Sequence, residues 1–370
     1  MPDIVLITGG AGFIGSHLAD ELVAAGYRVR ILDELIAQVH DGNGTPDYLP
    51  EDAELIVGDV CDRSLVRRAL NGVDAVVHLA ARVGVGQSMY EIADYAAANT
   101  GGTAVLLQEL LGQPVGRLVV ASSMSVYGEG AYIDSAGCST MACERARTQL
   151  EAGEWEARGP RGEELTPVPT PETKEPALAS VYALTKYDQE RLCLIFGSAY
   201  RVPTVALRFF NVYGPRQALS NPYTGVLAIF ASRLLNGRPP LVYEDGLQQR
   251  DFVSVHDVAR ATRLALEAEA AAGYAINVGS GDAVSVLEIA SKLAAVLDRP
   301  IEPEQTGKYR AGDIRHCFAD VRLAGDLLGF QAQVAFEDGI AELAEWLELQ
   351  AADDRVENAV EELASRGLMV

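Results

Sequence analysis

Short apolar runs alternate with helical patterns through the first two thirds of the chain. Arg28 to Leu32, Glu54 to Val57 and Thr204 to Phe209 are rich in apolar residues and predict strands. Helical patterns fill segments between such runs, as at Ser16 to Ala25 and about 178–199. Apolar strands that alternate with helices are typical of a parallel sheet covered on both faces. We therefore expect a doubly wound α/β fold, with further strands at Ile4–Ile7, Asp74–Leu79 and Arg117–Ala121.

Two segments interrupt this alternation. Residues 129–177 are polar, contain Gly and Pro, and separate a strand from its helix by more than an ordinary loop. After Asn211 the chain becomes rich in Pro and Gly, and we expect a smaller mixed lobe over the carboxyl ends of the strands. The sheet domain is predicted to comprise residues 1–210, with the insertion at 129–177, and about 251–279. The lobe is predicted to comprise residues 211–250 and 280–350. Residues 351–370 are expected to form an acidic C-terminal helix or tail, with Val356, Val360 and Leu363 on one stripe.

Composition narrows the possible partners. The 370 residues include 52 acidic and 30 basic side chains, a formal net charge of −22, so binding to nucleic acid or to an anionic membrane surface is not expected. No apolar run reaches about 18 residues, and the N-terminus lacks the features of a signal peptide. The five cysteines form no Cys-x-x-Cys pair, which suits a reducing compartment. We expect a cytoplasmic protein.

A glycine-rich turn follows the first expected strand. Gly9, Gly12 and Gly15 have the spacing that a dinucleotide-binding turn requires: the first permits the turn, the second lets a pyrophosphate approach and the third lets helix and strand pack closely. Asp33 closes the second strand, where a carboxylate accepts ribose hydroxyls and repels a 2′-phosphate. These features predict a Rossmann-type sheet that binds NAD. The cofactor site is expected to include Gly9, Gly12, Phe13, Ile14, Gly15, Asp33, Asp59 and Val60.

A tyrosine and a lysine are placed to act together. Tyr182 and Lys186 are four residues apart in an expected helix, so both side chains lie on one face. A free tyrosine has a pKa of about 10, and nearby positive charge would favour its phenolate at neutral pH. Ser123, and less directly Ser125, end the preceding strand and offer hydroxyls to a reacting oxygen. We expect these four side chains to be catalytic.

Five ordered motifs carry a family resemblance. TGGAGFIG (8–15), HLAA (78–81), SSMSVYG (122–128), YALTK (182–186) and RFFNVYGP (208–215) resemble the extended short-chain dehydrogenase/reductase family, and within it the nucleotide-sugar epimerases and dehydratases. The resemblance implies a nucleoside-diphosphate sugar as substrate, bound NAD, and a homodimer formed by helices near 91–111 and 178–199. It assigns Tyr182 as base, Lys186 to the nicotinamide ribose and Ser123 to the sugar O4. It also places Leu79, Ala80 and Ala81 on the cofactor, Val83 and Gly84 on the sugar, and Asn211, Arg250 and Arg315 on the diphosphate.

The residues after Ser123 discriminate between reactions. Family dehydratases resemble this pattern but have an Asp-Glu pair where this chain has Met124 and Ser125, and the related decarboxylases usually have a Glu there. Without that carboxylate a β-elimination lacks its acid and base, whereas oxidation and re-reduction at C4 needs neither. We therefore expect a 4-epimerase. A UDP-hexose or UDP-uronate 4-epimerase, a net NAD-dependent oxidoreductase and a catalytically silent NAD-binding scaffold are the alternatives.

The insertion gives a further indication of the subgroup. Its length and the segments PVPTPE (167–172) and SVYALTKYDQERL (180–192) resemble 4-epimerases that act on dTDP-6-deoxyhexoses such as dTDP-L-rhamnose. Cys138 and Cys143 are the two cysteines in the insertion, and it contains no His. Two candidate ligands do not make a tetrahedral zinc site, so no metal is expected.

Overall fold

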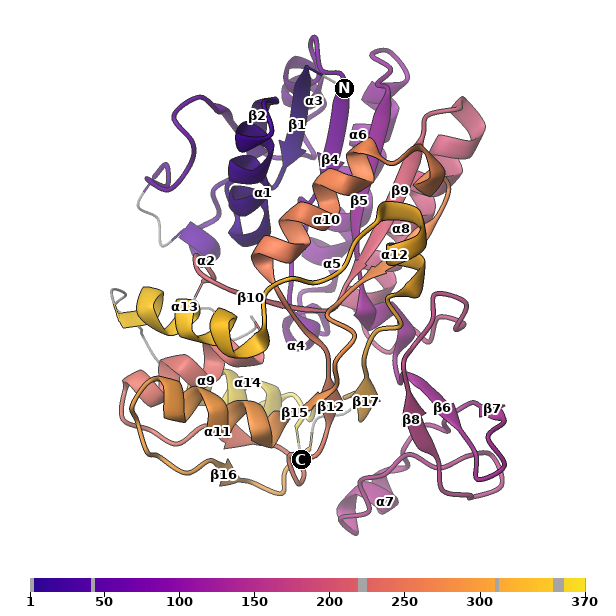
Figure 1. Cartoon of the computed structure of the whole chain (residues 1–370), viewed down its shortest axis with the longest axis vertical. Coiled ribbons are helices and arrows are strands. Elements are labelled where there is room, and N and C mark those ends of the chain that lie inside the picture. Colours follow the sequence, from indigo (N-terminus) through magenta and orange to yellow (C-terminus); the bar gives the residue numbers. More distant parts are fainter. Residues whose placement is uncertain (1–2, 41–43, 219–224, 310–312, 349–355, 370) are drawn as a thin grey trace.

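A seven-stranded parallel sheet forms the centre of the chain in this computed structural model, which describes residues 3–40, 44–218, 225–309, 313–348 and 356–369. The strand order is β14-β9-β5-β4-β1-β2-β3, with every neighbouring pair parallel. This is the predicted doubly wound α/β architecture (Figure 1). The strands are β1 (Ile4–Thr8), β2 (Arg28–Asp33), β3 (Glu54–Val57), β4 (Ala75–His78), β5 (Arg117–Ser123), β9 (Thr204–Phe209) and β14 (Ala275–Val278).

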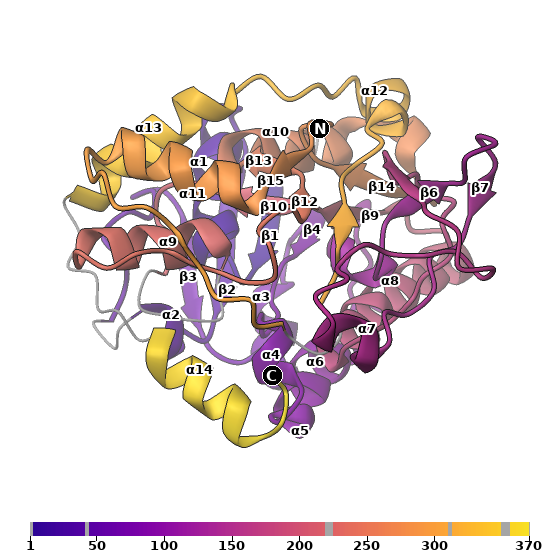
Figure 2. The same ribbon diagram turned by 90° about the horizontal axis from the view of Figure 1, so that it is seen from below.

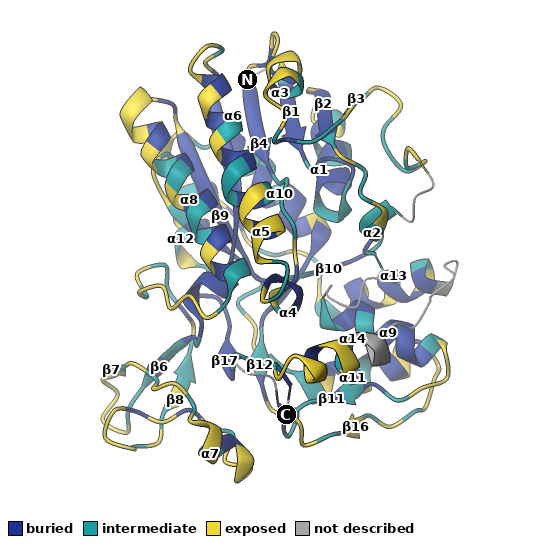
Figure 3. Cartoon of the chain, turned by 180° about the vertical axis from the view of Figure 1, so that it is seen from behind, coloured by how far each residue is buried: buried dark blue, intermediate teal, exposed yellow. Residues whose placement is uncertain are grey.

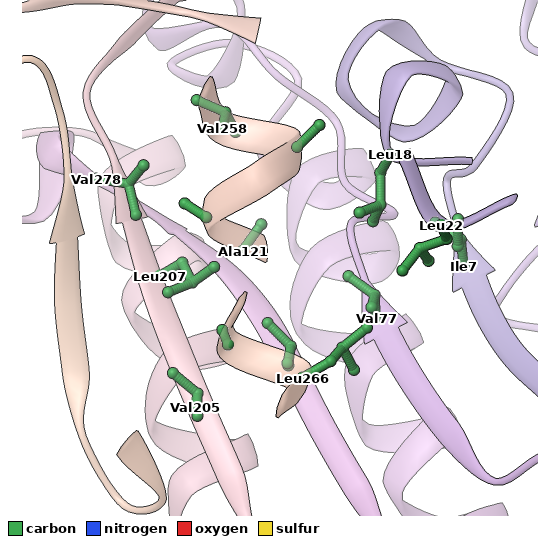
Figure 4. Close-up of a cluster of buried hydrophobic side chains, with 14 of the residues drawn as sticks. Ile7, Leu18, Leu22, Val77, Ala121, Val205, Leu207, Val258, Leu266 and Val278 are labelled. Atoms are coloured by element: carbon green, nitrogen blue, oxygen red, sulfur yellow. The ribbon is translucent and has the colours of Figure 1, made fainter. Parts of the chain in front are cut away.

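Helices cover both faces of this sheet. One face packs α1 (Phe13–Ala24), α10 (Val255–Glu267) and α12 (Arg322–Leu328) through a buried cluster that includes Leu18, Leu22 and Val258 (Figure 4). The other face packs α3 (Arg63–Ala69), α6 (Gly102–Leu110) and α8 (Val181–Tyr200). Each fully buried Leu or Val contributes about 1.5–3 kcal/mol relative to an exposed one, so these two layers fix the sheet that carries the site.

Several element boundaries differ from the sequence prediction by one to three residues, as in the first helix, which spans Phe13–Ala24 instead of Ser16–Ala25. The strand expected at Asp74–Leu79 is one residue shorter at each end. The strand expected to end at Ala121 continues through Ser122 and Ser123, because both serines pair with β9. The long helix begins at Val181, since the side chain of Ser180 accepts a hydrogen bond from the amide of Ala183 and caps the first turn.

The polar insertion has secondary structure of its own. Strands β6 (Ala131–Ile133), β7 (Ser139–Thr140) and β8 (Thr166–Val168) form a small antiparallel sheet beside α7 (Arg147–Glu151), at the lower right in Figure 1. It extends from the carboxyl end of β5. The remaining short elements of the sheet region are α2 (Ala37–His40), α4 (Val85–Ser88), α5 (Ile92–Tyr95), a π-helical segment (Ala96–Gly101) and 3-10 turns at Met124–Tyr127 and Glu269–Ala271.

A second group of elements lies beyond the carboxyl ends of the strands, at the bottom of Figure 1. Its core packs α9 (Val226–Leu235), α11 (Val286–Val296) and α13 (Phe336–Glu348) around Phe230 and Leu293. The predicted domain boundaries remain a prediction. The short strands here are β10 (Asn211–Tyr213), β11 (Leu241–Val242), β12 (Gln249–Arg250), β13 (Phe252–Ser254), β15 (Val284–Ser285), β16 (Glu304–Gln305) and β17 (His316–Cys317).

The acidic C-terminal segment forms a helix, α14 (Val356–Ser365), which lies near α4 in Figure 2. Of the predicted stripe, Leu363 is buried and Val360 is half-buried, while the side chain of Val356 lies outside the described set. The guanidinium of Arg366 lies 4.2 Å from the centre of the Tyr90 ring. Among the residues that the structure describes, no helix is both long and apolar enough to cross a bilayer.

A buried histidine in α1 makes stability depend on pH. His17 Nε2 lies 3.0 Å from the carbonyl oxygen of Pro215, and burial lowers the pKa of His17 from 6.5 to about 4. The unfolded chain therefore binds the extra proton first, and stability falls as pH drops from about 6.5 towards about 4, by about 1.4 kcal/mol per pH unit at most. We expect His17→Gln to lose this slope, measured by urea unfolding at several pH values. An identical slope in both proteins would contradict the burial of a neutral His17.

Candidate active site

The glycine turn is built as a cradle. Gly9 has φ +72°, and a Cβ there would lie 2.8 Å from the backbone nitrogen of Ala80. A Cβ on Gly15 would lie 2.3 Å from the carbonyl oxygen of Gly9. Gly12 caps α1 without a side chain, and a Cβ there would lie 3.5 Å from its nearest neighbour, the Gly9 carbonyl oxygen. The first turn of α1 therefore offers its N–H groups and its positive end to a phosphate.

These contacts give the glycines different roles. We expect Gly15→Ala to destabilise the fold, because its Cβ cannot coexist with the Gly9 carbonyl, and Gly12→Ala to keep the fold while weakening cofactor binding. Thermal unfolding and cofactor content of the purified proteins measure the two effects. Equal stability of Gly15→Ala and wild type would show that the close helix–strand contact is not required.

Asp33 ends β2 and supports the same turn. Its carboxylate accepts hydrogen bonds from the amides of Ala11 and Leu35, each at 2.9 Å. Asp59 follows β3 and accepts from the amide of Cys61 at 2.8 Å. Both carboxylates lie on the wall of one cavity of about 410 Å³.

This cavity brings together most of the residues predicted from the sequence. Its wall runs from the glycine turn across the carboxyl ends of the strands to the second group of elements. Gly84, Ser125, Arg250 and Arg315 are not on the wall. The predicted residues that are on it are Gly9, Gly12, Phe13, Ile14, Gly15, Asp33, Asp59, Val60, Leu79, Ala80, Ala81, Val83, Ser123, Tyr182, Lys186 and Asn211.

The expected catalytic side chains meet where β5 ends and α8 begins. Burial raises the pKa of Tyr182, and the neighbouring Ser123 hydroxyl lowers it in part. The hydroxyl of Ser125 donates to Ser123 Oγ at 2.9 Å, so Ser125 helps to orient the Ser123 hydroxyl. The amide of Tyr182 donates to Ser88 Oγ at 3.0 Å and fixes the start of α8 against α4.

Lys186 lies one helical turn further along the same face of α8. Its side chain is deeply buried, with 3% of the residue exposed, and burial lowers its pKa to about 7. The ammonium donates to Gln189 Oε1 at 2.7 Å. Motif spacing predicted the lysine but gave no signal for Gln189, since its role depends on the sheet behind the helix.

The buried side chain of Asn99 joins two segments of the cavity wall. It lies in the π-helical segment, accepts from the amide of Arg82 at 2.7 Å and donates to the Arg82 carbonyl at 3.1 Å. A third bond reaches Thr185 Oγ1 at 3.0 Å. Asn99 therefore joins the loop after β4 to α8 at the residue before Lys186.

Two amides on the cavity wall have unmet hydrogen-bonding capacity. Asn211 Oδ1 and Gln217 Oε1 are buried without a partner among the described residues. A buried polar atom without a partner costs about 1–3 kcal/mol, so both are suited to a polar ligand. Gln217 was not predicted, because a single glutamine after a Pro-Arg turn has no distinguishing sequence signal.

The two predicted diphosphate arginines lie elsewhere in this structure. Arg315 is fully buried and donates to Glu156 at 2.5 Å, Asp245 at 2.7 Å and Glu244 at 3.0 Å. Its guanidinium thus belongs to a carboxylate cluster instead of the cavity wall. The physical reason is that Glu156, from the insertion, and two acidic residues before β12 compete for it.

Arg250 is held next to that cluster. Its guanidinium donates to the carbonyl of Arg315 at 3.0 Å and to that of Ile314, and lies 3.5 Å from Asp313. Gly84, with φ +139°, starts α4 beside the wall. Within the described ranges, no group of three His, Cys, Asp or Glu side chains is arranged to hold a metal ion, and Cys138 and Cys143 are exposed thiols.

A glycine turn, a carboxylate at the end of β2 and a Ser-Tyr-Lys set on one cavity define a protein of the extended short-chain dehydrogenase/reductase class. Residues 5–149 and 156–279 match the NAD dependent epimerase/dehydratase family, and the chain belongs to that family. Its cofactor is NAD, and the cradle at Gly12 and the carboxylate of Asp33 fit this group.

Similar proteins include several nucleotide-sugar enzymes. The chain is 39% identical to a dTDP-L-rhamnose 4-epimerase of Burkholderia thailandensis, over 93% of this chain and 94% of the relative. The solved UDP-glucose 4-epimerase of Thermotoga maritima, with UDP-glucose, has a TM-score of 0.77 at 30% identity over 94% of this chain and 99% of that one. MoeE5 in complex with UDP-glucuronic acid and NAD has a TM-score of 0.75 at 32% identity, over 93% and 99%.

Proposed function

We propose that this chain is a nucleotide-sugar 4-epimerase that inverts C4 of a dTDP-6-deoxyhexose such as dTDP-L-rhamnose. The observation that carries the reaction type is the distribution of charge around Ser123. The carboxylates on the described cavity wall are Asp33, at the end of β2, Glu34, directly after it, and Asp59, after β3. β2 is three strands from β5 in the sheet, about 14 Å at the usual strand spacing. Tyr182 and Ser123 therefore work without a carboxylate that could drive elimination.

The side chains divide the work at C4. Tyr182 takes the proton from O4 and later returns it, while Ser123 holds O4 by a hydrogen bond. Lys186 favours the phenolate of Tyr182 by its positive charge. NAD, when bound, supplies the acceptor and donor of the C4 hydrogen, so the cycle needs no net oxidant.

Polar groups on the cavity wall are suited to the diphosphate. Asn211 and Gln217 contribute buried amides that can turn their N–H groups towards phosphate oxygens, and Arg82 adds a positive charge to the wall. A role for Arg250 and Arg315 in diphosphate binding stays a prediction. It requires both guanidinium groups to exchange their carbonyl and carboxylate acceptors for phosphate oxygens.

The choice of sugar rests on the relatives. The Burkholderia thailandensis dTDP-L-rhamnose 4-epimerase aligns over almost the whole of both chains, which favours a dTDP-6-deoxyhexose. Solved structures with UDP-glucose and UDP-glucuronic acid support a UDP-hexose or UDP-uronate 4-epimerase as the second candidate.

A homodimer is also proposed, and the cytoplasmic location stays a prediction. Figure 3 shows exposed residues along α5 and α8, on the side away from the sheet. Several large apolar side chains in this region are exposed, which favours a helical interface with a second copy of the chain. They are Ile92 on α5 (54% exposed) and Leu184 (46%) and Ile195 (57%) on α8; Leu111, directly after α6, is 51% exposed.

The test is a substrate panel. Purified protein is incubated with dTDP-L-rhamnose, UDP-hexoses and UDP-uronates without added NAD, and products are read by NMR. We expect C4 inversion of the dTDP-sugar with no net change in nicotinamide absorbance. Stoichiometric formation of reduced nicotinamide would instead assign an oxidoreductase, and no conversion across the panel would favour a binding scaffold.

A further inference from the structure

We propose that Gln189 is a positioning residue for the reaction: its side-chain carbonyl holds the Lys186 ammonium in place while leaving its charge uncompensated. This rests on the proposed function. Gln189 follows Lys186 by three residues on α8 and is fully buried. Lys186 Nζ donates to Gln189 Oε1 at 2.7 Å.

The orientation of this amide is fixed by its other neighbours. Gln189 Nε2 lies 3.2 Å from the carbonyl oxygen of Ala80 and 3.0 Å from Thr103 Oγ1. A backbone carbonyl can only accept, so the amide nitrogen must face Ala80 and the amide oxygen must face Lys186. A flipped amide would put two acceptors against each other and two donors against each other.

The nitrogen end of the amide is anchored to the central sheet. Gln189 Nε2 is 3.1 Å from His78 Nε2, and His78 Nδ1 lies 2.7 Å from Thr8 Oγ1. Thr103, in α6, reaches the same histidine at 2.8 Å. Burial lowers the pKa of His78 to about 3, so it stays neutral in this network. Lys186 is thus tied through Gln189 to β4, β1 and α6.

Burial lowers the pKa of Lys186 more than Glu190 and Cys193 on α8 raise it, and neither of these two side chains forms an ion pair with the ammonium in this structure. On α8, Glu190 is bound to Arg208 at 2.7 Å and to Ser122 at 2.7 Å, and the buried thiol of Cys193 has a raised pKa. From the sheet, the facing titratable group is the neutral His78. A neutral amide therefore satisfies the ammonium without cancelling the field that Tyr182 requires.

The substitution Gln189→Glu tests this directly. A carboxylate at this position would pair with Lys186 and raise the lysine pKa. It would also raise the pKa of Tyr182, because the new negative charge offsets the positive charge of the ammonium. We expect the acidic limb of the plot of kcat/KM against pH to shift to higher pH by about one unit. At pH values below this limb, kcat/KM would then fall about tenfold. Gln189→Met removes the acceptor, and we expect it to lower the lysine pKa further.

Lysine titration is measured independently of any sugar. The sequence has four lysines, Lys174, Lys186, Lys292 and Lys308. The NMR spectrum of protein labelled in its lysine side chains therefore contains few carbon signals. The signal of Lys186 is assigned by its absence from the spectrum of Lys186→Arg. The holoprotein is titrated for wild type, both Gln189 variants, and Gln248→Glu. Gln248 is a buried glutamine whose amide donates to the Tyr243 carbonyl, far along the chain from α8.

The outcomes separate the two proposals. Opposite shifts of the Lys186 pKa in Gln189→Glu and Gln189→Met, with no shift in Gln248→Glu, support the positioning role. A Lys186 titration unchanged by either Gln189 substitution, in folded protein that retains NAD, would overturn it. If the shifts occur but wild type converts no nucleotide sugar, the positioning role stands and the proposed function fails.

Discussion

Tyr182→Phe is expected to lower turnover by about 10²–10⁴ while leaving the fold and the NAD content unchanged. In the proposed reaction the phenol removes the O4 proton, because Ser123 lies beside it and Lys186 donates a hydrogen bond to Gln189. The ring itself stays in place in the variant, packed at right angles to Tyr95 at a centroid distance of 6.5 Å. Single-turnover and steady-state assays of the C4 epimer measure the effect.

The matched control for this substitution lies on the same helix. Tyr200, at the end of α8, is 58% exposed, and Tyr200→Phe should retain full turnover. Near-wild-type turnover of Tyr182→Phe would remove Tyr182 from the role of base.

Arg315→Met is expected to destabilise the protein by about 3–5 kcal/mol. The substitution leaves Asp245 and the buried Glu244 without the cation that both now share. Among the described residues, Glu244 keeps Arg145 at 2.7 Å, whereas Asp245 keeps no cation and accepts only from the amide of Leu247 at 3.0 Å. It also removes the Arg315 partner of Glu156, whose carboxylate then contacts only His316 of β17, at 3.0 Å, within the described part of the chain. Urea unfolding of the variant and of wild type at neutral pH measures the difference.

The control is Arg161→Met, because Arg161 is a largely exposed cation in the insertion that also contains Glu156. Exposed ion pairs contribute about 0–1 kcal/mol, so its loss should be small. If Arg315→Met kept full stability but lost affinity for dTDP, the arginine would be a diphosphate ligand, as the family resemblance implies, and the carboxylate cluster would be incidental.

The parts of the site that the sequence predicted are those governed by local geometry. Gly9, Gly12 and Gly15 lie in one turn, and Tyr182 and Lys186 lie four residues apart on one helix, so their relative positions follow from spacing alone. Parallel strands bring their carboxyl ends to one edge, which is why Asp33 and Ser123 could be expected on the same cavity.

The parts that it could not predict depend on contacts between distant segments. Arg315 meets Glu156 across 159 positions of sequence, and no local pattern indicates that an acid of the insertion would occupy its guanidinium. Gln189 acquires its role from Ala80 and His78, more than 100 residues earlier. Gln217 is identified only by an amide oxygen that the fold buries without a partner among the described residues.

The most direct test of the proposed reaction follows the hydrogen at C4. A dTDP-6-deoxyhexose carrying deuterium at C4 is incubated with the purified protein in ordinary water, without added NAD, and the product is examined by NMR and mass spectrometry. If C4 is oxidised and re-reduced by bound NAD, the inverted product keeps its deuterium and gains no solvent hydrogen at C3 or C5. Loss of the label, or exchange at C3 or C5, would contradict epimerisation through oxidation at C4.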